Sequence, residues 1–120
     1  MSRGPGHVMR HPRYAKRTTV RFGEGRLTCV GVVENLSLSG LFLTSTRVFA
    51  PGTKILIDFP LGNTICRLEG MVRWARRGSA TLMRVAPSGM GIEIISAPQA
   101  YQEMLLTIGA QRKNPHANVH

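Results

Sequence analysis

The segment 65–75 constrains the fold more than any other, because apolar or small residues occupy every second position from Cys66 to Trp74. Three of the four positions between them are charged, as in Cys66-Arg67-Leu68-Glu69, and the fourth is Met71. A period of two is that of a β-strand with one buried face, and it does not fit the 3.6-residue period of a helix. We therefore expect a strand whose inner face carries Cys66, Leu68, Gly70, Val72 and Trp74.

Shorter patterns of the same kind occur elsewhere, separated by turn residues such as Gly23-Glu24-Gly25 and Pro51-Gly52. Arg76-Arg77-Gly78-Ser79 and Pro87-Ser88-Gly89 are predicted to be further turns. About six short antiparallel strands joined by Gly-rich turns are typical of a closed or nearly closed barrel. The expected strand segments are 18–22, 27–34, 41–44, 54–59, 65–75, 80–85 and 90–95.

One helix is expected near the C-terminal end of the sequence. Ser96 and Gln99 have the spacing of a capping box, which predicts a helix from Ser96 to about Gly109. Its polar face contains no Lys or Arg, so packing against the barrel is favoured over a membrane surface. The apolar stripe that would pack consists of Tyr101, Met104, Leu105 and Ile108. The predicted fold is mostly β, a small antiparallel six-stranded β-barrel with one C-terminal α-helix.

Positive charge is concentrated at the start of the chain. The formal net charge is +10, and residues 1–26 contain seven Lys or Arg against one acid. Residues 1–17 also contain Pro and Gly without apolar periodicity, so we expect a flexible basic arm there. The barrel domain with its helix is expected over 18–111, and a flexible tail over 112–120. A positive surface attracts phosphates, nucleic acid or anionic membranes, so an anionic ligand is expected.

The titratable residues argue against catalysis. The six acids are scattered, so no carboxylate pair is predicted. All four histidines fall in the predicted arm or tail, so neither a nucleophile with a rigid His partner nor a metal site is predicted. We expect a binding protein that is not an enzyme and uses no cofactor. The two cysteines lie in apolar runs, and neither a signal peptide nor a membrane span is evident, which favours the cytoplasm without membrane insertion.

A polar turn and the arginine arm form the candidate ligand site. Asn35 and Ser37 can both donate and accept hydrogen bonds, and Gly40 permits a positive φ or a close approach of chains. An arginine can grip a phosphate, or the O6 and N7 atoms of guanine, with two parallel hydrogen bonds. A purely structural interpretation stays open, in which Asn35 and Ser37 only form a hydrogen-bonded turn and the arginines a solvated face.

These residues resemble two motifs of the PilZ domain family, bacterial receptors for cyclic di-GMP. The motifs are RxxxR on an N-terminal arm and (D/N)xSxxG on a barrel turn. Asn35, Ser37 and Gly40 fill the second motif, and the later strands and the closing helix follow in the order of the family, so the resemblance extends from about Arg10 to Ile108.

The first motif has two possible registers. Arg13 and Arg17 match RxxxR literally. Family members often have the pattern Arg-Arg-x-x-Arg directly before the first strand, and residues 9–13 can be aligned with it. In this alignment Arg13 is the second arginine of the RxxxR motif, and Met9 stands where the first should be. Arg10 matches the additional arginine next to that first position. The 22-residue separation of Arg13 from Asn35 favours this register. The ligand-binding residues implied by the resemblance are Arg10, Arg13, Asn35, Ser37 and Gly40, with Arg17 as the alternative.

The resemblance implies that Arg10 and Arg13 grip guanine and phosphate groups of cyclic di-GMP while Asn35 and Ser37 bond the other guanine edge. Binding would order the arm, and an unidentified partner protein in motility, biofilm attachment or secretion would read the change. A second hypothesis follows from Met9, which stands where the family motif has its first arginine. In this hypothesis the protein is a degenerate PilZ-like adaptor that binds no cyclic di-GMP. A third, nucleic-acid binding, is disfavoured because the aromatic residues fall mostly at core positions and leave no stacking platform.

Overall fold

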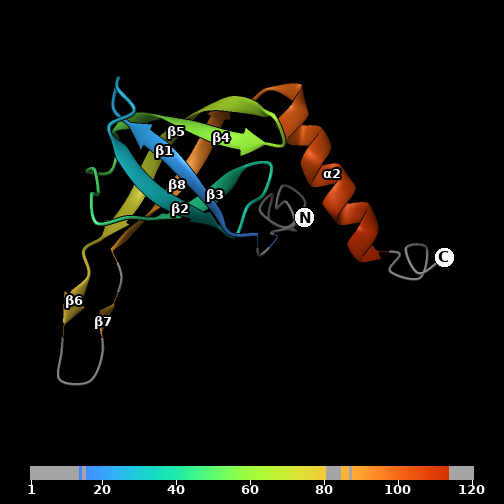
Figure 1. Cartoon of the computed structure of the whole chain (residues 1–120). Coiled ribbons are helices and arrows are strands. Elements are labelled where there is room, and N and C mark those ends of the chain that lie inside the picture. The colour runs from blue at the N-terminus through green and yellow to red at the C-terminus, as the bar shows by residue number, and fades with distance from the viewer. Residues whose placement is uncertain (1–13, 15, 81–84, 87, 114–120) are drawn as a thin grey trace, which may run out of the picture.

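The computed structural model describes residue 14 and residues 16–80, 85–86 and 88–113. Six antiparallel strands close into a barrel in the order β1-β2-β3-β8-β5-β4, and the helix α2 (Gln99–Lys113) follows the last strand (Figure 1). This confirms the predicted six-stranded barrel with one C-terminal helix. The barrel strands are β1 (Thr18–Gly23), β2 (Cys29–Glu34), β3 (Gly40–Thr44), β4 (Lys54–Leu61), β5 (Thr64–Arg76) and β8 (Gly89–Ser96).

The alternation of side chains along the strands produces the core. In β2, Cys29, Gly31 and Val33 are buried whereas Val30 between them is 61% exposed. Inward-facing side chains from all six strands fill a barrel of this size, and the removal of their apolar surface from water is the main force for folding. Fully buried side chains of the barrel include Val20, Phe22, Val33, Leu41, Leu43, Ile55, Ile57, Phe59, Leu68 and Met90.

Strand β5 follows the predicted alternation as far as Val72 and then departs from it. Val72 pairs with Ile92 and Trp74 pairs with Gly91, so Arg73 is an extra residue in the ladder. This β-bulge places Trp74 on the outer face, where it is 48% exposed. The prediction that Trp74 faces inward was wrong, because one inserted residue changes the face of the residues beyond it.

A two-stranded hairpin extends from the barrel beyond β5 and β8. It consists of β6 (Ser79–Ala80) and β7 (Val85–Ala86), which pair antiparallel, so the chain reverses between these two strands (Figure 1). Two predictions were therefore wrong, because residues 80–85 are not one strand and residues 76–79 are not the turn. Pairing with the returning strand satisfies the backbone N–H and C=O groups of this segment, and this outweighs the local turn signal.

Helix α2 begins at Gln99 and ends at Lys113, whereas the sequence predicted limits of Ser96 and about Gly109. Ser96 is instead the last residue of β8 and caps no helix. The helix starts after Pro98 because the residue before a proline disfavours the helical conformation. The Pro98 carbonyl then accepts the first hydrogen bonds of the helix.

The predicted apolar stripe of α2 packs on the barrel. Tyr101 and Leu105 are buried, and Met104 and Ile108 are half-buried. The Tyr101 ring meets the edge of Phe59, with the ring centroids 5.5 Å apart. None of the described residues forms a helix with the length and apolarity that a bilayer crossing requires.

Candidate ligand-binding site

The turn between β2 and β3 carries Asn35, Ser37 and Gly40, and its geometry explains two of these residue types. Asn35 has a φ of 55°, in the left-handed region that Asn tolerates better than most residues. The φ of Gly40 is not positive, but a Cβ at this position would lie 2.8 Å from the Ile92 carbonyl oxygen. Of the two roles left open for Gly40, the structure therefore shows the close approach of chains.

Ser37 is fully buried, and its hydroxyl is used inside the turn. The Oγ atom accepts hydrogen bonds from the Gly40 N–H at 3.0 Å and the Ser39 N–H at 3.2 Å, and it donates to the Gly40 carbonyl at 3.1 Å. The Ser37 N–H also donates to the Gly40 carbonyl, at 2.8 Å. Ser37 thus holds the shape of the turn, while the Asn35 side chain is exposed at its surface.

Helix α2 supports the turn from inside the molecule. The Tyr101 hydroxyl donates to the Ser37 carbonyl at 3.1 Å, and both residues are fully buried. A buried tyrosine normally places its ring in the core and satisfies its hydroxyl with a partner. This contact was missed at the level of sequence, because 64 residues separate the two groups. It couples the position of the helix to the shape of the turn.

One described residue of the basic arm is paired directly with the turn. The Tyr14 N–H donates to the Leu36 carbonyl at 2.7 Å, and the Leu36 N–H donates to the Tyr14 carbonyl at 2.9 Å, which together form an antiparallel bridge. Leu36 is fully buried and Tyr14 packs against the core. The chain therefore enters the barrel beside the residue that lies between Asn35 and Ser37.

Of the arginines predicted for the site, Arg17 is described, whereas Arg10 and Arg13 lie outside the described residues. The Arg17 side chain is 72% exposed, and its guanidinium lies 3.7 Å from the carboxylate of Glu34. That carboxylate also accepts a hydrogen bond from the Thr44 hydroxyl at 3.2 Å. An exposed ion pair at this distance restrains Arg17 only weakly.

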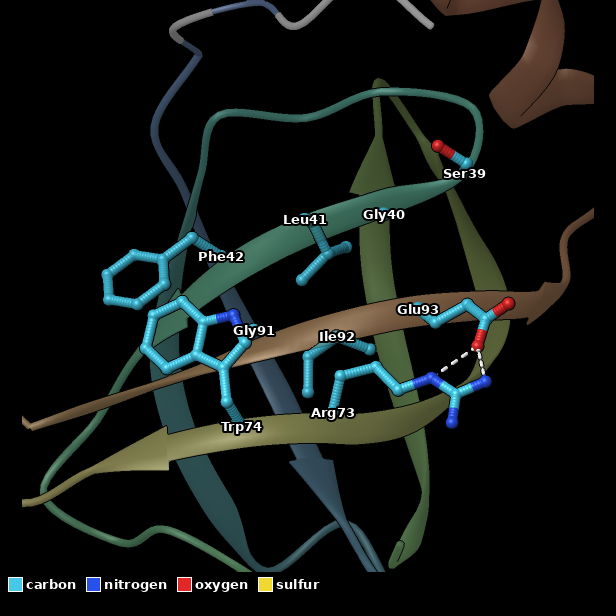
Figure 2. Close-up of a pocket in the computed structure, with 9 residues that line it drawn as sticks. All are labelled: Ser39, Gly40, Leu41, Phe42, Arg73, Trp74, Gly91, Ile92 and Glu93. Atoms are coloured by element: carbon cyan, nitrogen blue, oxygen red, sulfur yellow. Dashed lines mark hydrogen bonds and ion pairs between the residues drawn. The ribbon is translucent and has the colours of Figure 1, made fainter. Parts of the chain in front are cut away.

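An open pocket of about 480 Å³ lies on the outer face of β3, β8 and β5, directly beyond the turn (Figure 2). Ser39 and Gly40 belong both to the turn and to the pocket wall, so the two features are continuous. The complete lining consists of Ser39, Gly40, Leu41, Phe42, Arg73, Trp74, Gly91, Ile92 and Glu93.

Phe42 and Trp74 form an aromatic surface at one end of the pocket (Figure 2). Their rings stack with centroids 5.4 Å apart and 24° between the planes. Both residues pair with Gly91, where a Cβ would lie 2.1 Å from the Trp74 Nε1 atom, so the glycine makes room for the indole. This surface was not predicted from the sequence, because Trp74 was expected in the core. The two glycines of β8, Gly89 and Gly91, are a signal for such a close approach.

The other end of the pocket is charged. The Arg73 guanidinium donates to the Glu93 carboxylate, and both side chains are substantially exposed (Figure 2). A comparable exposed arginine on the same strand, Arg67, pairs with Asp58 away from the pocket, and the hydrogen bond to this carboxylate raises the pKa of Arg67. The pocket thus offers an apolar plane and a paired cation side by side.

The structure is thus a closed barrel with an open pocket of aromatic and charged residues on its outer face. Among the described residues, no three His, Cys, Asp or Glu gather into a possible metal site. The chain belongs to the PilZ domain family, whose model matches residues 8–108, and this confirms the resemblance found in the sequence. PilZ domains are receptor or adaptor domains of a cyclic di-GMP-binding type. No curated protein matches the chain.

Proposed function

We propose that this protein is a cytoplasmic receptor that binds cyclic di-GMP between its basic arm and the Asn35–Gly40 turn, with the ligand extending into the neighbouring pocket. The observation that carries the proposal is the Tyr14–Leu36 bridge, because it joins the end of the arm to the turn that bears the second family motif. Membership of the PilZ domain family supports the ligand class. The net charge of +10 favours an anionic ligand.

In this proposal Arg10 and Arg13 grip guanine and phosphate groups of the ligand. Arg13 directly precedes Tyr14, the residue whose bridge to Leu36 joins the arm to the turn. A planar guanidinium matches the geometry of phosphate oxygens and of the guanine edge with two hydrogen bonds. Arg17 is the alternative grip residue, since its exposed ion pair is weak enough to be exchanged for a phosphate.

The turn supplies recognition in two ways. The exposed Asn35 amide bonds a guanine edge, and Ser37 contributes by holding the turn, since its own hydroxyl is occupied there. Gly40 lets β3 approach β8 closely at the point where the turn meets the pocket wall. A guanine ring placed against the Phe42–Trp74 surface gains stacking energy.

The output of binding is a change of shape and charge that another protein reads. In the proposed mechanism the bound ligand holds the arm over the barrel face, and it is released without any bond being made or broken. The partner belongs to a pathway that controls motility, surface attachment or secretion.

Isothermal titration of the purified protein with cyclic di-GMP tests the proposal. Arg13→Ala removes a charged hydrogen-bonding group and should weaken binding by about tenfold to a hundredfold, and Asn35→Ala by about twofold to tenfold. Arg26→Ala is the matched control, because it removes the same charge from the β1–β2 turn at the other end of β2. An absence of heat at high micromolar ligand, or equal effects of the Arg13 and Arg26 substitutions, would refute the assignment.

A second candidate function is an adaptor that acts through protein contacts without the ligand. Met9 in the favoured register and the internal use of the Ser37 hydroxyl both favour it. A pull-down from cell extract with and without cyclic di-GMP separates the two functions. The same partner captured in the same amount under both conditions supports the adaptor, and capture that depends on the ligand supports the receptor.

A further inference from the structure

The β-bulge in β5 places two successive side chains on the same outer face. Val72 is fully buried and pairs with Ile92, Trp74 pairs with Gly91, and the extra residue Arg73 between them also points outward. In a regular strand only every second residue faces outward, so the successive residues Arg73 and Trp74 could not both line this pocket. The bulge therefore has a chemical consequence, since it brings a guanidinium and an aromatic plane into one pocket.

An arginine beside an aromatic plane matches the two parts of a nucleotide. The plane of a base stacks on the ring, and the phosphate accepts two hydrogen bonds from the guanidinium. Figure 2 shows Phe42 and Trp74 at one end of the pocket and the Arg73–Glu93 pair at the other, with Ser39 of the turn beyond them. A ligand held at the turn thus reaches the guanidinium of Arg73 from the same face of the barrel.

The Arg73–Glu93 ion pair is suited to exchange. The side chains of Arg73 and Glu93 are 59% and 46% exposed, and solvent screens an interaction of this kind so that it shifts an equilibrium by at most about fivefold. A phosphate oxygen that enters the pocket competes with the carboxylate for the same N–H donors. Glu93 therefore holds the Arg73 side chain in place when no ligand is bound. When a phosphate binds, the negative charge of Glu93 repels it and lowers the affinity.

We propose that Arg73 is a ligand-contacting residue that grips a phosphate group of cyclic di-GMP, and that Glu93 is the counterion which the phosphate displaces. This inference rests on the proposed function. The guanidinium of Arg73, on the barrel, then compensates for the arginine that is missing at Met9, the first position of the arm motif. Specificity for the ligand is then shared between the turn, the arm and the bulge.

Titration of cyclic di-GMP into variants of the protein tests the proposal, with calorimetry and the emission of Trp74, the single tryptophan of the chain, as two readouts. Arg73→Gln should weaken binding about tenfold, because it removes a charged donor. Glu93→Gln should strengthen binding about twofold to fivefold, a gain that loss of folding cannot produce. Arg67→Gln and Asp58→Asn are the matched controls, since they break a comparable pair on β5 and β4 outside the pocket.

The outcomes separate the inference from the proposed function on which it rests. If Asn35→Ala weakens binding but Arg73→Gln behaves like Arg67→Gln, the inference is overturned and the receptor assignment stands. If the wild-type protein binds no cyclic di-GMP, both fall. The inference also fails if Glu93→Gln increases affinity equally in the Arg73→Gln background, because the gain then does not act through Arg73.

Discussion

Ser37→Ala is the substitution that most directly separates a residue holding the turn from a residue touching the ligand. The change deletes the Oγ atom that accepts hydrogen bonds from the amides of Gly40 and Ser39. The Gly40 amide is buried, so its N–H is left without that acceptor, and an unsatisfied buried donor costs about 1–3 kcal/mol. We expect the free energy of unfolding to fall by about 2 kcal/mol in the protein without ligand.

Urea denaturation followed by tryptophan fluorescence measures this loss. With an m-value of about 2 kcal/mol per M, typical of a small domain, the midpoint should fall by about 1 M. Ser39→Ala is the control, because Ser39 is exposed and its hydroxyl makes only a 3.4 Å contact with the Ser37 Oγ, so its midpoint should stay within about 0.25 M of wild type.

The reasoning would be refuted if Ser37→Ala unfolded at the wild-type urea concentration and yet lost affinity for cyclic di-GMP. That result would mean that the Ser37 hydroxyl serves the ligand and that the turn keeps its shape without it. A parallel loss of stability and affinity, with Ser39→Ala close to wild type in both, is the expected result.

Three further substitutions test the packing around the site. Tyr101→Phe removes the buried bond from the helix to the turn and should cost about 1 kcal/mol in urea denaturation, and an unchanged midpoint contradicts that bond. Gly91→Ala places a Cβ 2.1 Å from the Trp74 Nε1 atom, so the indole must leave its position and its emission should shift to the red, whereas unchanged emission argues against the aromatic surface. Leu105→Ala should cost about 2–5 kcal/mol, whereas Leu106→Ala, at a site that is 65% exposed, should cost less than about 0.5, and equal losses would mean that α2 packs differently.

Strand positions and the composition of the core were predictable because the side-chain period of a strand is a local property. The alternation in β5 as far as Val72 correctly identified the buried face, and the stripe on α2 correctly identified Tyr101 and Leu105. Each of these predictions depends only on which residues neighbour one another along the chain and on the preference of apolar side chains for the interior.

The site was predictable in part. The residue type of Asn35 has a local reason, its left-handed φ, whereas the glycine at position 40 is required by β8, because a Cβ there would lie 2.8 Å from the Ile92 carbonyl oxygen. The burial of Ser37 was not readable, because the partner that closes over it, Tyr101, lies on a helix 64 residues away.

Tertiary pairing decided the features that the sequence alone could not. The bulge at Arg73 lies in the pairing of β5 with β8, beyond the part of β5 that pairs with β4, and it turned Trp74 from an expected core residue into part of a pocket. The pairing of β6 with β7 likewise moved the chain reversal away from residues 76–79 to between these two strands. A local pattern sets which face a residue prefers, but the register of a closed barrel is set by the sum of all strand pairings, and no single segment contains that sum.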